Sequence, residues 1–179
     1  ELSFGVDFNQ PVDGFIPNNL EILIFGMEFN QPVLNLPHNL KTLKFGYYHN
    51  NIMDIMNHRT GFRQSICALP CNLTTLYLGN SFYRQSLNCL NHGIKELYVG
   101  MCTLGPFDNL PESLTKLYFI SNYVHDADID GVLSNGLETL VLYDKYNKSV
   151  DNLPNRLKHI YFGNDFNQPM NALPLSLEK

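Results

Sequence analysis

The sequence predicts a mainly β solenoid, a stack of about eight coils of roughly 20 to 22 residues with a parallel sheet along one face. The first observation is an apolar trio, Leu-x-Phe or a close variant, that begins at Leu2, Leu23, Leu43, Leu76, Leu97, Leu117, Leu140 and Ile160. The second is its spacing of 21, 20, 33, 21, 20, 23 and 20 residues. A period near 20 indicates small coils that bury their apolar side only by stacking on neighbours. The 179 residues therefore form one elongated domain.

Each trio is expected to be a β-strand. Its two apolar anchors, such as Leu23 and Phe25, lie two residues apart and point to the same side of an extended chain, while Ile24 between them points to the other. One face of the sheet is therefore core and the other is presented to solvent. We expect a turn with positive φ after the strand, because a glycine stands there in six units: Gly5, Gly26, Gly46, Gly79, Gly100 and Gly163.

The remainder of each coil contains two further motifs. Phe-Asn-Gln-Pro follows the glycine in three copies, from Phe8, Phe29 and Phe166. We expect this Phe to stack inside the coil and the amides to bond backbone groups at the turn. Leu-Pro pairs such as Leu36-Pro37 and Leu153-Pro154 come later and disfavour helix. They predict an irregular or short 3₁₀ convex side.

These motifs together resemble the FNIP repeat, a relative of the leucine-rich repeat. The resemblance covers essentially all of residues 1–179, with both ends lying within a repeat and one long insertion at 47–61. It implies a leucine-rich-repeat-like solenoid that serves as a recognition domain. Family members often join such repeats to an F-box, and some to a protein kinase domain. We therefore expect this chain to be a piece of a longer protein.

Composition and motifs exclude several function classes. The net charge is -5 with only 12 Lys and Arg, so we expect no nucleic-acid partner. No apolar stretch approaches the roughly 18 residues that span a membrane, and we expect a soluble, cytoplasmic chain. No catalytic or phosphate-binding motif is present, which predicts a protein without enzymatic activity or cofactor. The cysteines fit neither a zinc pattern nor a dense disulfide framework and are interpreted as free thiols; pairing of Cys67 with Cys89, at similar points of consecutive coils, is the alternative.

Two insertions depart from the repeat. Fifteen residues, 47–61, stand where two suffice after Gly26, and they form either a turn that folds back on the scaffold or a loop that contacts a partner. The second insertion creates an acidic turn that ends at Gly131 and resembles the opening of a calcium loop. Its second half lacks the required spacing, so a solvated turn is favoured and calcium is a weak alternative. The candidate ligands of that alternative are Asp126, Asp128 and Asp130.

The presented face carries the candidate partner-binding residues. Tyrosines occupy three consecutive strands between the anchors, and charged residues lie beside them, with Glu96 and Lys116 placed to pair across adjacent strands. Strand propensity alone also favours tyrosine at such positions. Exposed tyrosines flanked by charge are nevertheless typical of interface hot spots. The candidate surface consists of Lys44, Tyr77, Tyr98, Tyr118, Glu96, Lys116 and Tyr161.

Two classes of function follow from this reading. The first is a noncatalytic scaffold for protein–protein recognition, which by resemblance is the substrate-binding region of an F-box type ubiquitin-ligase adaptor or the targeting module of a multidomain kinase. The second is a structural protein whose uncapped ends or sheet edges assemble into larger particles. The identity of the protein partner is not predicted.

Overall fold

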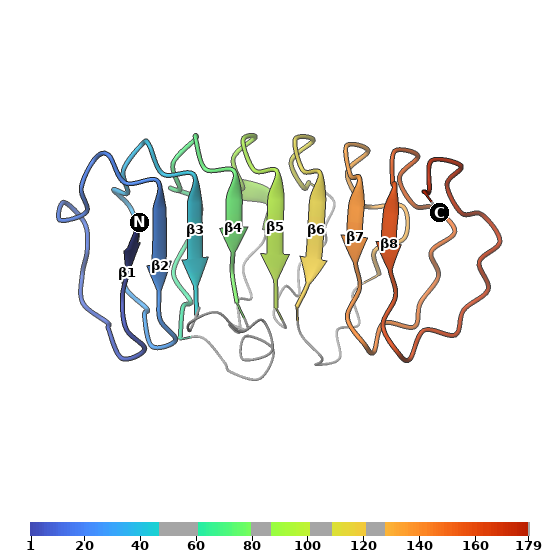
Figure 1. Cartoon of the computed structure of the whole chain (residues 1–179), viewed down its shortest axis with the longest axis horizontal. Coiled ribbons are helices and arrows are strands. Elements are labelled where there is room, and N and C mark those ends of the chain that lie inside the picture. The colour runs from blue at the N-terminus through green and yellow to red at the C-terminus, as the bar shows by residue number, and fades with distance from the viewer. Residues whose placement is uncertain (47–60, 80–86, 101–108, 121–127, 179) are drawn as a thin grey trace.

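The computed structural model describes residues 1–46, 61–79, 87–100, 109–120 and 128–178. Eight short parallel strands form one sheet in the order of the chain, so the molecule is an elongated solenoid with its two ends far apart (Figure 1). The strands are β1 (Leu2–Ser3), β2 (Ile22–Phe25), β3 (Thr42–Phe45), β4 (Thr75–Tyr77), β5 (Glu96–Val99), β6 (Lys116–Phe119), β7 (Thr139–Val141) and β8 (His159–Tyr161). The predicted fold class is confirmed.

The register of the sheet follows the apolar anchors. Leu23 pairs with Leu43, and Leu43 pairs with Leu76 although 33 residues separate them. Tyr98 pairs in the same way with Tyr118 on the next strand. Residues at one repeat position therefore form straight columns along the solenoid, and the candidate surface is built from such columns.

Stacked aromatic rings fill the N-terminal half of the core. Phe25 stacks on Phe29 of its own coil with ring centroids 3.7 Å apart, and Phe45 stacks on Phe62 at 3.8 Å. Successive rings of one column are farther apart, as shown by the 5.6 Å between Phe25 and Phe45. All four rings are fully buried. The Phe of the Phe-Asn-Gln-Pro block thus packs inside the coil, as predicted.

The glycines after the strands correct one expectation. Positive φ occurs there at Gly46 and Gly79, but not at Gly26 or Gly163. At Gly26 an added Cβ would collide with the backbone of Gly5 in the preceding coil, and at Gly163 with the backbone of Asp144. These two glycines are needed because neighbouring coils approach closely, which is a different reason from the one predicted.

The amides of the Phe-Asn-Gln-Pro block form hydrogen bonds between coils. The side-chain oxygen of Asn9 accepts the backbone N–H of Asn30 at 2.9 Å and the side-chain amide of Gln31 at 3.1 Å. The side chain of Asn30 accepts the N–H of Arg63 and the amide of Gln64 in the same way. The predicted structural role of these amides is confirmed.

The convex side contains almost no regular structure within the described residues. Its helical element there is a single short 3₁₀ turn, η1 (Leu87–Cys89). Leucines of the Leu-Pro pairs, such as Leu36 and Leu153, are buried in the core. The irregular or 3₁₀ convex side is as predicted. In the part of the chain that is described, no helix is long and apolar enough to cross a membrane.

A disulfide corrects the interpretation of the cysteines as free thiols. Cys67 and Cys89 are bonded, with their Cα atoms 5.0 Å apart. The bond forms because the two residues stand at similar points of consecutive coils, whose backbones run about 5 Å apart. Cys71 is free and exposed. Cys102 lies outside the described residues.

Candidate partner-binding surface

Three tyrosines on the presented face form a continuous stack, which we call the tyrosine ladder: Tyr77, Tyr98 and Tyr118. The first two rings lie with centroids 3.7 Å apart at an angle of 7°, and the second and third lie 4.3 Å apart at 4°. Strands β4, β5 and β6 hold them in register, one ring on each. The strand spacing of about 4.8 Å brings the planar side chains of one column close to stacking distance.

One end of the tyrosine ladder is covered by a lysine, and a valine is the register neighbour at the other end. The ammonium group of Lys44 on β3 lies 4.8 Å from the centroid of the Tyr77 ring, a cation–π contact. At the other end Tyr118 pairs in register with Val141 on β7. Since the ring faces are turned toward one another and, at one end, toward Lys44, the ladder offers mainly ring edges and phenol groups to a partner.

Burial shifts the pKa values of two groups in this column. The pKa of Tyr98 is raised far above its ordinary value, first by burial and then by the neighbouring Tyr77 and Tyr118 phenols. Burial also lowers the pKa of Lys44, against a smaller opposing effect of Glu1. The phenol of Tyr98 is therefore a neutral hydrogen-bonding group at any physiological pH.

The predicted ion pair lies beside the tyrosine ladder. The ammonium group of Lys116 is 2.7 Å from a carboxylate oxygen of Glu96, between adjacent strands. The hydrogen bond to Glu96 raises the pKa of Lys116. Both side chains are partly exposed, so the pair contributes little to stability. Its charges remain accessible to a partner.

The same column continues on both sides of the ladder. Tyr161 on β8 is largely exposed, and Val141 separates it from Tyr118. Ile24 on β2 was expected on the presented face but is buried. Its register neighbour is Lys44, whose side chain is half-buried. The methylene groups of a lysine side chain can cover neighbouring apolar surface while the ammonium group stays in contact with water.

The acidic turn has a structural task. One carboxylate oxygen of Asp130 accepts the backbone N–H of Asn152 at 2.6 Å, and the other accepts the Asn152 side-chain amide at 2.9 Å. Asp128 accepts the N–H of Asp130. Asp13 binds Asn35 of the next coil by the same two types of bond. The Asp-Gly turn is thus a repeated structural feature of the solenoid. It was not predicted, although the pair Asp13-Gly14 repeats the pair Asp130-Gly131 in the sequence.

These bonds bear on the candidate metal ligands. Asp128 accepts a hydrogen bond within the turn and Asp130 accepts hydrogen bonds from Asn152 of the next coil, while Asp126 lies outside the described residues. Across the described residues, no group of three or more His, Cys, Asp and Glu side chains is placed to hold a metal ion. Most of the long insertion, 47–60, also lies outside the described residues.

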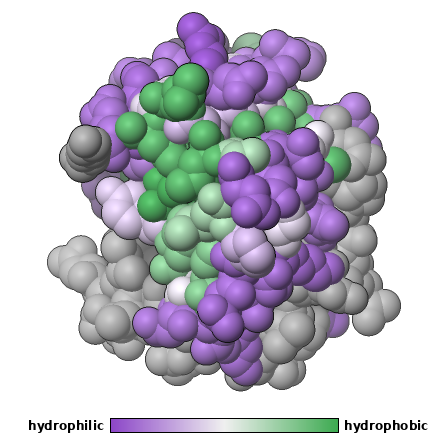
Figure 2. All heavy atoms as spheres, turned by 90° about the vertical axis from the view of Figure 1, so that its right-hand side faces the viewer, coloured by the Kyte–Doolittle hydropathy of each residue, from purple (hydrophilic) through white to green (hydrophobic). Residues whose placement is uncertain are grey.

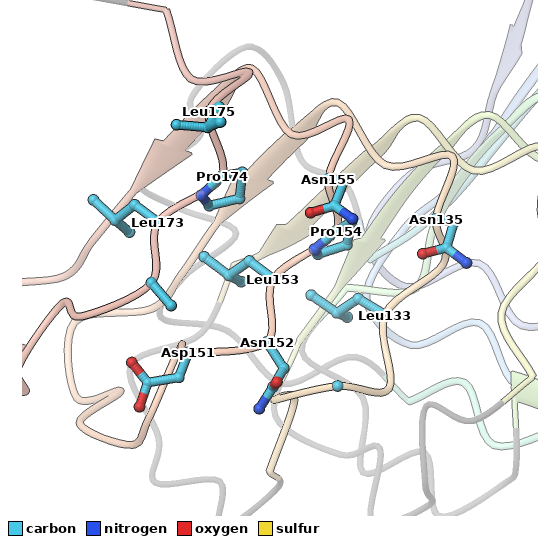
Figure 3. Close-up of a pocket in the computed structure, with 12 residues that line it drawn as sticks. Leu133, Asn135, Asp151, Asn152, Leu153, Pro154, Asn155, Leu173, Pro174 and Leu175 are labelled. Atoms are coloured by element: carbon cyan, nitrogen blue, oxygen red, sulfur yellow. The ribbon is translucent and has the colours of Figure 1, made fainter.

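A furrow on the convex side near the C-terminal end was not predicted. Equivalent leucines of three coils, Leu133, Leu153 and Leu173, lie in a row along it, with Asn135 and Asn155 at its rim (Figure 3). Its volume is about 600 Å³ and it is widely open. A similar furrow lies beside Cys89 and Leu110. Since such furrows recur between coils, they follow from the repeat rather than from a particular ligand.

Comparison with known proteins agrees with this geometry. The family model described as FNIP Repeat matches residues 1–28, 8–48 and 146–179. The crystal structure of CroV588, a circular LRR protein, is similar over 98% of this chain, with a TM-score of 0.69 and 31% sequence identity. This chain spans 29% of the length of that one. No curated protein matches the sequence.

Proposed function

Because this chain carries FNIP repeats on a leucine-rich-repeat-like solenoid, we propose that it is a noncatalytic recognition module that binds a protein partner through the tyrosine ladder and its flanking charges. The observation that carries the proposal is the continuous stack of Tyr77, Tyr98 and Tyr118 on a face that the core does not use. Repeat scaffolds present binding surfaces of this extended kind.

Stacking prepares the tyrosine ladder for binding. A side chain that is mobile before association loses about 0.5 to 1.5 kcal/mol of conformational freedom when an interface orders it. Tyr98 is held between two rings, and Tyr77 lies between Tyr98 and Lys44. Much of this ordering is therefore complete before a partner arrives. The phenol groups and the Glu96–Lys116 pair then supply directional hydrogen bonds at the edge of a rigid apolar surface.

More specifically, we propose that this chain brings its bound partner to a second protein or domain that acts on it. Resemblance to F-box proteins with FNIP repeats favours the substrate-binding region of a ubiquitin-ligase adaptor. The targeting module of a multidomain kinase is the alternative. In both roles the residues of this chain recognise the partner, and a different domain of the full-length protein, the F-box or the kinase, would act on it.

Affinity capture with graded variants tests the proposal. The wild-type chain, Tyr98→Phe and Tyr98→Ala are used as baits in extracts of the source organism. Tyr98→Phe keeps the ring stack and removes one hydroxyl, whereas Tyr98→Ala also opens a gap in the stack. We expect a specific partner that is reduced by Tyr98→Phe and lost, by tenfold or more in affinity, with Tyr98→Ala.

Leu34→Ala is the matched control, because Leu34 is an exposed apolar residue of an inner coil outside the presented face. Thermal melting must show that each bait is folded. Partners that bind all baits equally would contradict recognition by the tyrosine ladder. Co-purification of ubiquitin-ligase subunits with the full-length protein would favour the adaptor. A full-length protein that contains a kinase domain and does not co-purify with these subunits would favour the alternative.

A further inference from the structure

Charge distinguishes one face of the solenoid from another. Viewed along the solenoid, hydrophobic side chains gather in the middle and hydrophilic side chains surround them over most of the outline (Figure 2). On the presented face, the charged residues around the tyrosine ladder are mainly lysines. Lys41 and Lys95 are exposed and stand immediately before β3 and β5, Lys116 begins β6, and Lys44 lies over the first ring. Ammonium groups therefore accompany the tyrosine ladder from β3 to β6.

Carboxylates are scarce in the same area. Glu96 is the one carboxylate among strands β3 to β6 and the residue before each, all of which the structure describes. Lys116 holds it at 2.7 Å, and Lys41 pairs with Glu21 of the preceding coil. Even with Glu21 included, four lysines stand beside two carboxylates, whereas the rest of the chain contains fifteen carboxylates and eight Lys or Arg. The area around the tyrosine ladder is therefore basic on an otherwise acidic protein.

Lys95 keeps its charge available to a partner. Its side chain is exposed and forms no ion pair with any residue that the structure describes. The hydroxyl of Thr115 on the next coil donates to the backbone carbonyl of Lys95 at 3.1 Å, which fixes the backbone from which the lysine extends. Lys41 stands two strands away, at about 10 Å. Carboxylates three residues apart on an extended chain are separated by a similar distance, about 10 Å.

The tyrosine ladder has the dimensions of a short extended segment. It is one ring wide, and together with Lys44 it crosses four neighbouring strands, β3 to β6. At about 4.8 Å per strand this is a length of about 14 Å, which an extended chain covers with about four or five residues. The ring edges can receive the backbone and apolar atoms of such a chain, while acidic side chains on it reach the lysines beside the rings.

We propose that the tyrosine ladder binds an extended acidic segment of its protein partner, with carboxylates of that segment paired to Lys44, Lys95 and Lys116. The inference rests on the proposed function, because it names the chemistry of the partner that the same surface recognises. An acidic segment is kept extended by repulsion among its own charges. The remainder of this protein is acidic and repels such a segment, so complementary charge directs it to the tyrosine ladder.

Selection from a displayed library of random dodecapeptides tests the inference. The wild-type chain is the bait, and fluorescence anisotropy then measures the affinity of each selected peptide at low and high salt. We expect the selected peptides to be enriched in Asp and Glu and to bind more weakly as the salt concentration rises. Their affinity should fall tenfold or more for Tyr98→Ala, because the gap in the stack removes the surface on which they lie.

Two charge variants test the lysines without opening the stack. Lys95→Glu reverses an exposed charge that holds no ion pair among the described residues and should weaken the acidic peptides by about tenfold. Lys44→Met keeps an apolar side chain over the ring of Tyr77, removes the charge, and should weaken them by about threefold. Lys145→Glu is the matched control, because it makes the same change of charge in the exposed turn after β7. It should leave the affinity within about twofold.

Other outcomes overturn the inference, provided that circular dichroism shows each variant to be folded. Neutral or basic peptides that are lost with Tyr98→Ala would refute the acidic partner and leave recognition by the tyrosine ladder standing. Acidic peptides that bind Tyr98→Ala as well as the wild type would contradict the proposed function too. A selection without any binder would show that an extended segment is not the ligand. A single-stranded oligonucleotide that displaces the selected peptides and binds more tightly would identify a nucleic acid as the ligand instead.

Discussion

At the scale of single residues, Gly26 and Gly5 occupy the same repeat position and differ only in what lies against them. Gly26→Ala forces a methyl group against the backbone of the preceding coil, and we expect it to lower the free energy of unfolding by about 1 to 3 kcal/mol. Gly5→Ala has open space around the new methyl and should change stability by less than about 1 kcal/mol. Urea denaturation measures both; equal effects would contradict the close approach of the coils.

The polar residues show which hydrogen bonds between coils can be predicted from a sequence pattern and which cannot. The amides of Asn9 and Asn30 recur in near-perfect blocks, so a structural role could be predicted. The Asp130 turn was predicted to be a solvated turn, with a cation loop as the alternative, and its bonds to the next coil were not predicted, because its partner Asn152 is 22 residues away and neither residue indicates the contact alone. The partners of hydrogen bonds between coils can be identified only when the register of the strands is known.

At the scale of elements, the register of the strands was predictable and the packing on their presented face was not. The spacing of anchors such as Leu43 and Leu76 fixes which residues share a column. It does not determine that Tyr77 and Tyr98 turn their rings face to face, or that Lys44 covers the end of the stack, because side-chain rotamers depend on neighbours in three dimensions.

The stacked arrangement predicts a shift in the alkaline titration of the protein. Tyr98 has a raised pKa in the folded state, so its neutral phenol stabilises the fold below the ordinary tyrosine pKa near 10, and this contribution is lost as pH rises above that value. Tyr98→Phe should therefore lose less stability than the wild type when pH is raised from about 9 to 11. Denaturation at several pH values measures this; parallel curves for the two proteins would contradict it.

At the scale of the whole molecule, the Cys67–Cys89 disulfide joins two consecutive coils across 22 residues. A crosslink of this span contributes about 3 kcal/mol to stability. We expect a reductant to lower the unfolding midpoint of the wild type and of Cys71→Ser, and to leave Cys67→Ser unchanged. Equal sensitivity of Cys67→Ser would contradict the pairing.

The same bond bears on where the protein acts. Structural disulfides persist in oxidising compartments and are rare in the cytoplasm, whereas the sequence alone led us to expect a cytoplasmic chain. Thiol labelling of the protein taken directly from cells distinguishes the two: a protected pair indicates an oxidising compartment, and labelled Cys67 and Cys89 indicate the cytoplasm.

The long insertion has a consequence for how such proteins change over generations. Phe45 before it and Phe62 after it still stack at 3.8 Å, and Asn30 still accepts the N–H of Arg63 across 33 positions. The coils on both sides therefore keep the contacts of the repeat, although the segment between Gly46 and Gly61 is much longer than the two residues that follow Gly26. We therefore expect changes in the length of that segment to leave these flanking contacts in place, so that variation there can be selected for binding.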